Sequence, residues 1–112
     1  MKLHDKIVLV TGGSRGIGKA ISKLFVEEGA QVIITSKNII KLEQTAKEIN
    51  CSFFIGADIK NENDVNNAIK KIIEKFGRID ILVNNAGILP EQKQLDQINE
   101  NDWNEIIDVN LT

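Results

Sequence analysis

The sequence predicts an α/β fold, in which a parallel β-sheet has helices on both faces. Four short apolar runs alternate with segments of helical periodicity, which is typical of repeated strand–helix–strand units. The runs are apolar at nearly every position rather than at every second one, as expected of strands covered on both sides. The chain has 112 residues, enough for one domain and too few for two, so residues 1–112 are expected to form a single domain.

The strands are expected at residues 6–10, 31–35, 52–56 and 79–83. Parallel neighbours need a crossover connection, and such crossovers are almost always right-handed. With a helix in each connection, this rule favours the strand order 3-2-1-4. It also places the first two helices on one face of the sheet and later helices on the other.

Apolar residues spaced three and four apart predict a helix between consecutive strands. The stripes consist of Ile17, Ala20, Ile21, Leu24 and Phe25 in the first helix, Ile39, Leu42, Ala46 and Ile49 in the second, and Val65, Ala68, Ile69, Ile72, Ile73 and Phe76 in the third. Gly29 and Gly77 follow the first and third helices, where glycine commonly ends a helix. Asn61 is expected to cap the third helix, because its side chain can accept from a free backbone N–H group.

Composition and charge exclude several classes of protein. Basic and acidic residues are intermixed and the formal net charge is -2, so no basic face for nucleic acid or an anionic membrane is expected. Charged residues interrupt the N-terminal segment, unlike a signal peptide, and no apolar run is long enough to cross a bilayer. Cys51 is the only cysteine, which allows no internal disulfide and no cysteine metal cluster. We therefore expect a cytoplasmic protein without a metal site.

A glycine-rich loop, T-G-G-S-R-G-I-G, joins the first strand to the first helix and contains Gly12, Gly16 and Gly18. Such a loop lets backbone N–H groups and the positive end of the helix approach a phosphate group without side chains in the way. The strand before it and the helix after it favour a phosphate site over a tight turn that merely contains glycine.

Two kinds of phosphate site compete at this loop. The spacing from Gly13 to Gly18, followed by Lys19, also fits the loop of mononucleotide-hydrolysing proteins. However, Ala20 occupies the place where those proteins use a serine or threonine to hold magnesium. Asp80 lies near the start of an expected strand rather than at its end, so it does not complete such a metal site. Mononucleotide hydrolysis is therefore the weaker interpretation.

Three further motifs follow the loop in order. Asp58-Ile59 ends the third strand, N-N-A-G begins at Asn84, and Asn110 lies in V-N-L-T. Together with T-G-x-x-x-G-x-G, they resemble the short-chain dehydrogenase/reductase family, in particular its 3-oxoacyl-carrier-protein-reductase-like group. The resemblance covers essentially the whole chain. It implies the N-terminal half of a Rossmann-type fold and an oxidoreductase that transfers a hydride between NADP(H) and a carbonyl/alcohol substrate.

The resemblance implies roles for individual residues. Asp58 corresponds to the aspartate that contacts the adenine, with a cap or turn aspartate as the structural alternative. Asn84 lies in a loop that is partly structural in the family. The residues implied for cofactor binding are Gly12, Ser14, Arg15, Gly16, Ile17, Gly18, Ser36, Lys37, Asp58, Ile59, Asn84, Ala86 and Gly87.

Asn110 resembles the active-site asparagine of the family. Trp103, Ile106 and Ile107 predict a helix whose apolar stripe continues through Asn110. An uncharged polar residue in such a row needs hydrogen-bond partners, which makes it a candidate catalytic residue, with a satisfied core asparagine as the alternative.

The residues after the second strand favour NADP(H) over NAD(H). NAD-preferring relatives usually end this strand with an acid that binds the ribose 2′-hydroxyl group. Here Ser36 and Lys37 occupy that place, and a hydroxyl and an ammonium group attract a 2′-phosphate. Arg15 of the glycine loop can approach the same phosphate from the other side.

The catalytic set implied by the resemblance is incomplete in this sequence. The family uses a tyrosine as acid/base, a lysine four residues later and a serine that orients the substrate. The sequence contains no tyrosine and stops before the region where that serine is expected. Asn110 is thus the one catalytic position present, and the chain alone is expected to be inactive.

Three interpretations remain open. In the first, the chain is part of an oxidoreductase whose C-terminal half comes in trans or is missing from this sequence. The complete enzyme would act on a small carbonyl or alcohol and could be a homo-oligomer. Alternatively, the chain is a non-catalytic nucleotide-binding or interaction module, or a non-functional truncated fragment. In each case the fourth strand is expected to lack a neighbour and to expose an apolar edge.

Overall fold

Five parallel strands and three helices make up the part of the chain that the computed structural model describes, namely residues 3–12, 16–51, 53–58, 60–84 and 107–110. The sheet has the order β3-β2-β1-β4-β5. The elements are β1 (Ile7–Thr11), α1 (Gly16–Glu27), β2 (Gln31–Ser36), α2 (Ile39–Ile49), β3 (Phe53–Gly56), α3 (Glu62–Phe76), β4 (Ile81–Asn84) and β5 (Ile107–Asn110). The fold is of the Rossmann type, and the predicted order 3-2-1-4 is confirmed for the first four strands.

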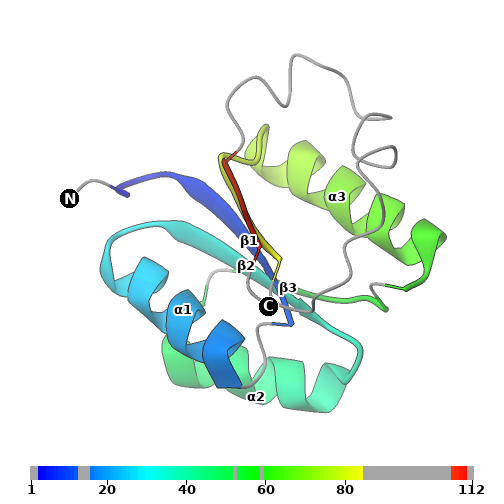
Figure 1. Cartoon of the computed structure of the whole chain (residues 1–112), viewed down its shortest axis with the longest axis horizontal. Helices are drawn as coiled ribbons and strands as arrows, with labels where there is room; N and C mark the ends of the chain where they lie inside the picture. Colours follow the sequence, from blue (N-terminus) through cyan, green and yellow to red (C-terminus); the bar gives the residue numbers. More distant parts are fainter. Residues whose placement is uncertain (1–2, 13–15, 52, 59, 85–106, 111–112) are drawn as a thin grey trace.

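The helices cover both faces of the sheet, as predicted. Figure 1 shows α1 and α2 on one side of the strands and α3 on the other. Val8, Val32 and Ile34 point to the side of α1 and α2, where they pack with Leu42 and Ile49. On the opposite side, α3 packs over the alternate strand residues; this second core contains Ile7, Leu9, Ile33, Ile55, Val65, Ala68, Ile69, Ile72, Ile79 and Leu82. Because β1, β2 and β4 are buried from above and below, their apolar runs are continuous.

The register of the sheet brings the carboxyl ends of the strands to one edge. Thr11 is level with Thr35 of β2 and with Asn84 of β4. Ser36 is in turn level with Gly56 of β3. The loops that follow β1, β2 and β3 therefore begin beside one another, which is the arrangement in which open parallel sheets bind ligands.

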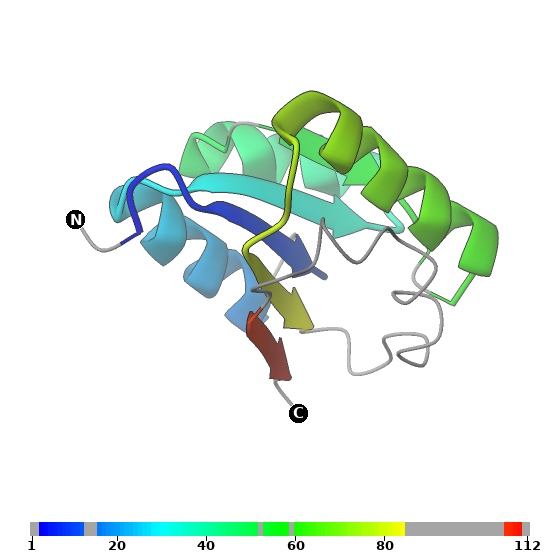
Figure 2. The ribbon, with the colours of Figure 1, turned by 90° about the horizontal axis from the view of Figure 1, so that it is seen from above.

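The helix predicted to include Ile107 and Asn110 is not found at these residues. Residues Ile107–Asn110 form β5, which lies beside β4 in Figure 2. The two strands pair in parallel, so that Asn110 is level with Asn84. Ile107 and Val109 alternate with polar residues, and β-branched residues in alternation suit a strand at the edge of a sheet. The edge of β4, expected to be exposed, is thereby hydrogen-bonded.

The apolar stripe predicted for α1 is only partly buried. Ile17 and Leu24 are 63% and 56% exposed, whereas the buried positions of the helix are Gly18 and Ser22. The Ser22 hydroxyl donates to the Gly18 carbonyl oxygen at 2.7 Å, so its polar group is satisfied within the helix. Small residues at the contact let the helix backbone lie close to the sheet, which moves the larger apolar side chains to the flanks.

The predicted ends of α3 are confirmed. Asn61 is the N-cap, and its side-chain oxygen accepts from the Asp64 N–H group at 3.2 Å. Gly77 ends the helix in the left-handed conformation, with φ +83°, a conformation that costs other residues free energy. Both signals are local in the sequence, which is why they can be recognised without the fold.

An ion pair joins the two helices on the same face of the sheet. The Lys19 ammonium group of α1 donates to the Glu48 carboxylate of α2. This hydrogen bond, reinforced by the positive charge of Lys19, lowers the pKa of Glu48 below its ordinary value of 4.5. The side chain of Glu48 is 52% exposed, so solvent screens the interaction and its contribution to stability is small.

We expect replacement of Glu48 by glutamine to lower the unfolding midpoint at neutral pH by a small amount that disappears in acid. A carboxyl whose pKa is lower in the folded state stabilises above its unfolded pKa, and the contribution is lost as the pH falls through the folded value. Thermal unfolding from pH 7 down to pH 3 measures the difference between parent and variant. Glu74→Gln, on the exposed face of α3, is the control; a Glu48→Gln difference that persists unchanged in acid would contradict the assignment.

Candidate cofactor-binding site

Gly12 and Gly16 of the first loop have backbone conformations that only glycine adopts readily. Gly12 has φ +67° and Gly16 has φ +60°, both in the left-handed region. A Cβ atom at Gly16 would meet nothing within 4 Å, so backbone conformation rather than space restricts that position. The Gly12 N–H group donates to the Thr35 carbonyl oxygen at 2.9 Å, which anchors the start of the loop to β2.

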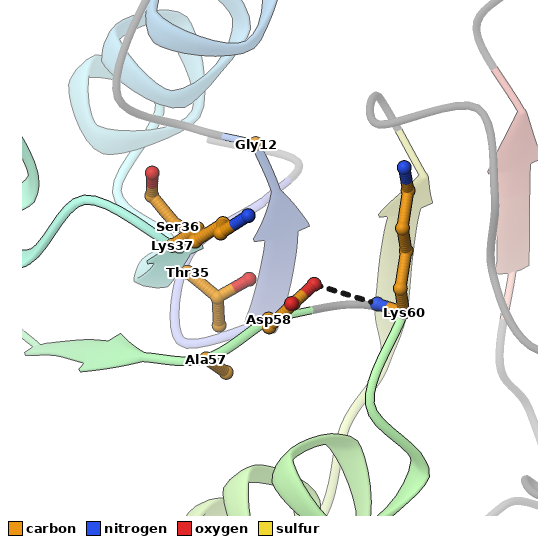
Figure 3. Close-up of a pocket in the computed structure, with 7 residues that line it drawn as sticks. All are labelled: Gly12, Thr35, Ser36, Lys37, Ala57, Asp58 and Lys60. Atoms are coloured by element: carbon orange, nitrogen blue, oxygen red, sulfur yellow. Dashed lines mark hydrogen bonds between the residues drawn. The ribbon is translucent and has the colours of Figure 1, made fainter.

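A cavity of about 250 Å³ lies at the carboxyl edge of the sheet. Its wall comes from the ends of β1 and β2 and from the segment after β3, as Figure 3 shows. The lining residues are Gly12, Thr35, Ser36, Lys37, Ala57, Asp58 and Lys60. Three chain segments that are distant in sequence therefore contribute to one site.

The charged groups of the cavity suit a ligand that carries both phosphate and hydrogen-bond donors. Lys37 and Lys60 supply two ammonium groups on exposed residues, and Asp58 supplies one half-buried carboxylate. Ammonium groups bind phosphate oxygens, and a carboxylate accepts hydrogen bonds from amino or hydroxyl groups. The Ser36 hydroxyl accepts from the Asn38 N–H group at 3.3 Å, so this hydroxyl is held at the start of α2.

Asp58 is fixed by its own turn. Its carboxylate atom Oδ1 accepts from the Lys60 N–H group at 3.0 Å, the dashed line in Figure 3. Its carbonyl oxygen accepts from the Asn61 N–H group at 2.9 Å, just where α3 begins. Within the part of the chain that the structure describes, the other carboxylate atom, Oδ2, makes no hydrogen bond and can accept one from a ligand.

Asn84 is the last residue of β4 and is buried, although it does not line the cavity. Its side chain is 5% exposed, and its Oδ1 atom lies 3.3 Å from the Thr11 hydroxyl, which also approaches the Val83 carbonyl oxygen at 3.3 Å. These contacts join the ends of β1 and β4. Asn110 is level with it on β5.

The structure brings together four of the residues implied for cofactor binding, since Gly12, Ser36, Lys37 and Asp58 line one cavity. Gly16 and Gly18 lie in the first turn of α1. Ile17 is there too, with its side chain exposed. The implied residues that lie outside the described part of the chain are Ser14, Arg15, Ile59, Ala86 and Gly87.

Three lining residues were not identified from the sequence. Thr35 precedes Ser36 at the end of β2, Ala57 precedes Asp58, and Lys60 follows it by two residues. Each lies within two residues of a predicted site residue. Treating the segments at the ends of β2 and β3 as a whole would therefore have included them. Lys19, the residue that fitted a mononucleotide loop, pairs with Glu48 instead.

The described residues contain neither a helix long and apolar enough to span a bilayer nor a group of three or more acidic, histidine or cysteine side chains suited to a metal ion.

The chain is similar to proteins of one family. Residues 6–112 match the family of short chain dehydrogenases. The chain is 37% identical to L-fucose dehydrogenase from Bos taurus over 106 aligned residues. The alignment covers 95% of this chain and 39% of that protein. An uncharacterised oxidoreductase from Listeria monocytogenes is 31% identical over 115 residues, 99% of this chain and 46% of its own length. The chain thus spans less than half the length of these relatives.

Solved structures show the same similarity in three dimensions. The active-site complex of Pseudomonas aeruginosa RhlG with NADP has a TM-score of 0.72 and 38% identity, over 77% of this chain and 35% of that one. A 3-ketoacyl-(acyl-carrier-protein) reductase from Brucella melitensis, in complex with NADH, has a TM-score of 0.71 and 38% identity, over 86% of this chain and 43% of that one. With the match to the family over almost its entire length, this chain belongs to the short chain dehydrogenases.

Proposed function

We propose that the chain forms the cofactor-binding part of an NADP(H)-dependent oxidoreductase that transfers a hydride between NADP(H) and a small carbonyl or alcohol substrate. The observation that carries the proposal is the cavity at the carboxyl edge, where Ser36, Lys37 and Asp58 meet the first glycine of the loop. Family membership supports oxidoreductase chemistry, and the charges of the cavity support the choice of cofactor.

The described residues suit a dinucleotide. The left-handed Gly12 and Gly16 let a pyrophosphate approach the backbone at the start of α1, and the Oδ2 atom of Asp58 can accept from the adenine amino group. Gly18 and Ile17 continue that first turn, while Ser14, Arg15, Ile59, Ala86 and Gly87 are proposed to contribute on the resemblance alone. When bound, the nicotinamide supplies or accepts the hydride.

Lys37 and Ser36 support NADP(H) over NAD(H). An acid at the end of β2 would repel a 2′-phosphate, whereas here a hydroxyl and an ammonium group border the cavity. Two solved relatives contain different cofactors, NADP in one and NADH in the other, so the family alone does not decide. The charge at the end of β2 is therefore the basis of the choice.

Asn110 is proposed to belong to the proton relay of the complete enzyme. Its backbone is level with Asn84 at the carboxyl edge of the sheet, the edge that also holds the cavity. The tyrosine, lysine and serine of the family's catalytic set are expected in sequence that the 112 residues do not include. We propose that they come from a C-terminal continuation or from a second chain in trans.

Carbonyl-dependent oxidation of NADPH tests the function. The native protein, enriched from its source cells with any chain that accompanies it, is mixed with NADPH and a panel of ketones, aldehydes and a 3-oxoacyl thioester. We expect the NADPH absorbance to fall only when a carbonyl compound is present. A preparation that binds NADPH but oxidises it with no member of the panel would favour the second candidate, a non-catalytic nucleotide-binding module.

We also propose a cytoplasmic location and assembly with further copies or with the missing half. The sequence contains one cysteine, Cys51, which allows no internal disulfide, in keeping with a reducing compartment. A nucleic acid or membrane partner is not proposed, because the charges of the chain are mixed and its net charge is -2.

A further inference from the structure

The segment after β3 is tied to the first turn of α3 by hydrogen bonds on both sides of Asp58. The Asp58 N–H group donates to the Asp64 carboxylate atom Oδ2 at 2.9 Å in a half-buried contact. The Asp58 carbonyl oxygen accepts from the Asn61 N–H group at 2.9 Å. Both backbone polar groups of Asp58 are thus held by α3, which packs its own apolar face on the sheet.

Asp64 connects this turn to the helix cap. Its own N–H group donates to the Asn61 side chain at 3.2 Å, while its carboxylate reaches past the cap to Asp58. In an ordinary capping box the side chain at this position returns to the N–H group of the cap residue itself. Here it accepts instead from the residue that lines the cavity, three positions upstream of the cap.

We infer that Asp64 is a positioning residue for nucleotide binding: its carboxylate holds the Asp58 backbone so that the Asp58 carboxylate faces the cavity. This inference rests on the function proposed above. Asp58 Oδ1 is occupied by the Lys60 N–H group, so the position of Oδ2 depends on the conformation of the turn. Loss of the Asp64 acceptor leaves the half-buried Asp58 N–H group unpaired, and the turn can then relax toward solvent.

A double-mutant cycle between Asp58 and Asp64 tests the inference. We expect Asp64→Ala to weaken NADPH binding about tenfold, the effect of one charge-assisted hydrogen bond. In an Asp58→Ala background the same substitution is expected to have almost no further effect, because Asp64 acts through Asp58. Asp64→Asn retains an acceptor oxygen and is expected to restore most of the affinity. The readout is the dissociation constant of NADPH from the increase in nicotinamide fluorescence.

Glu62→Ala is the matched control, since Glu62 is an exposed acid in the same first turn of α3. It is expected to leave the affinity unchanged. If Asp64→Ala does not fold, Asp64→Glu replaces it, with the carboxylate displaced by one methylene group and an intermediate loss of affinity expected.

The outcomes separate the inference from the function on which it rests. Effects of Asp58→Ala and Asp64→Ala that simply add would show that Asp64 stabilises the fold without positioning Asp58, and would overturn the inference. Weaker binding in Asp58→Ala with parent affinity in Asp64→Ala would overturn the inference alone. Parent affinity in Asp58→Ala would remove the proposed contact of Asp58 with the cofactor, and the inference with it.

Discussion

Replacement of Lys37 by glutamate is expected to lower the affinity of the chain for NADPH roughly 10- to 100-fold while changing its affinity for NADH far less. Lys37 borders the cavity beside Ser36, and its ammonium group is proposed to bind the 2′-phosphate that distinguishes the two cofactors. A hydrogen bond to a charged group contributes about 1.5–3 kcal/mol, and a carboxylate in its place would also repel the phosphate. Dissociation constants for both cofactors measure the selectivity.

The control for this prediction is Lys70→Glu, on the exposed face of α3. It changes the net charge by the same amount, so any general effect of charge on anion binding appears in it as well. Equal weakening of NADPH and NADH by Lys37→Glu, or an equal effect of the Lys70→Glu control, would contradict the assignment of the 2′-phosphate to Lys37.

Replacement of Ile33 by alanine is expected to lower the free energy of unfolding by about 2–5 kcal/mol. Ile33 lies in the middle of β2 with 0% of its surface exposed, and it belongs to the core beneath α3. The substitution removes apolar contacts and leaves a cavity that the surrounding strands cannot fill. Because a domain of this size typically has about 5–15 kcal/mol of stability in total, the loss is a large part of it.

Ile40→Ala deletes the same atoms at a residue that is 70% exposed, in the first turn of α2, and is the matched control. Its effect is expected to stay within about 0.5 kcal/mol. Urea unfolding followed by far-ultraviolet circular dichroism gives both values. Similar losses in the two variants would show that Ile33 is not in a well-packed core.

The first four strands could be predicted from the sequence because burial on both faces produces continuous apolar runs. The run expected at residues 6–10 is found as β1 one residue later, and the first four strands have the expected order. The cap at Asn61 and the end of α3 at Gly77 were predictable for another reason, since each depends on a local hydrogen bond or a local φ.

Other features depend on packing that the sequence does not reveal. Ile17 and Leu24 of α1 are exposed because the small residues Gly18 and Ser22, rather than these larger ones, face the sheet. The alternation at Ile107–Asn110 also fits an edge strand, and the structure places β5 there rather than a helix.

Four residues that line the candidate site were predicted from the sequence, but the contact that holds Asp58 in place was not. Ser36 ends a strand and Gly12, Lys37 and Asp58 follow strands, and a parallel sheet brings such residues to one edge. The contact from Asp64 to the Asp58 backbone depends on how the turn after β3 folds back on α3. In the sequence, Asp64 stands three residues after the Asn61 cap. That position indicates a capping role rather than a contact with a binding residue.

Addition of NADPH to the nitrogen-15-labelled chain, followed by the backbone amide chemical shifts, locates the binding site of the cofactor. We expect the largest changes around the cavity, at Gly12, Ser36, Lys37 and Asp58, and no change at Asp80, which lies at the opposite edge of the sheet. Shifts concentrated away from the carboxyl edge, or no shifts at a saturating concentration of NADPH, would contradict the assignment of this cavity to a nicotinamide dinucleotide.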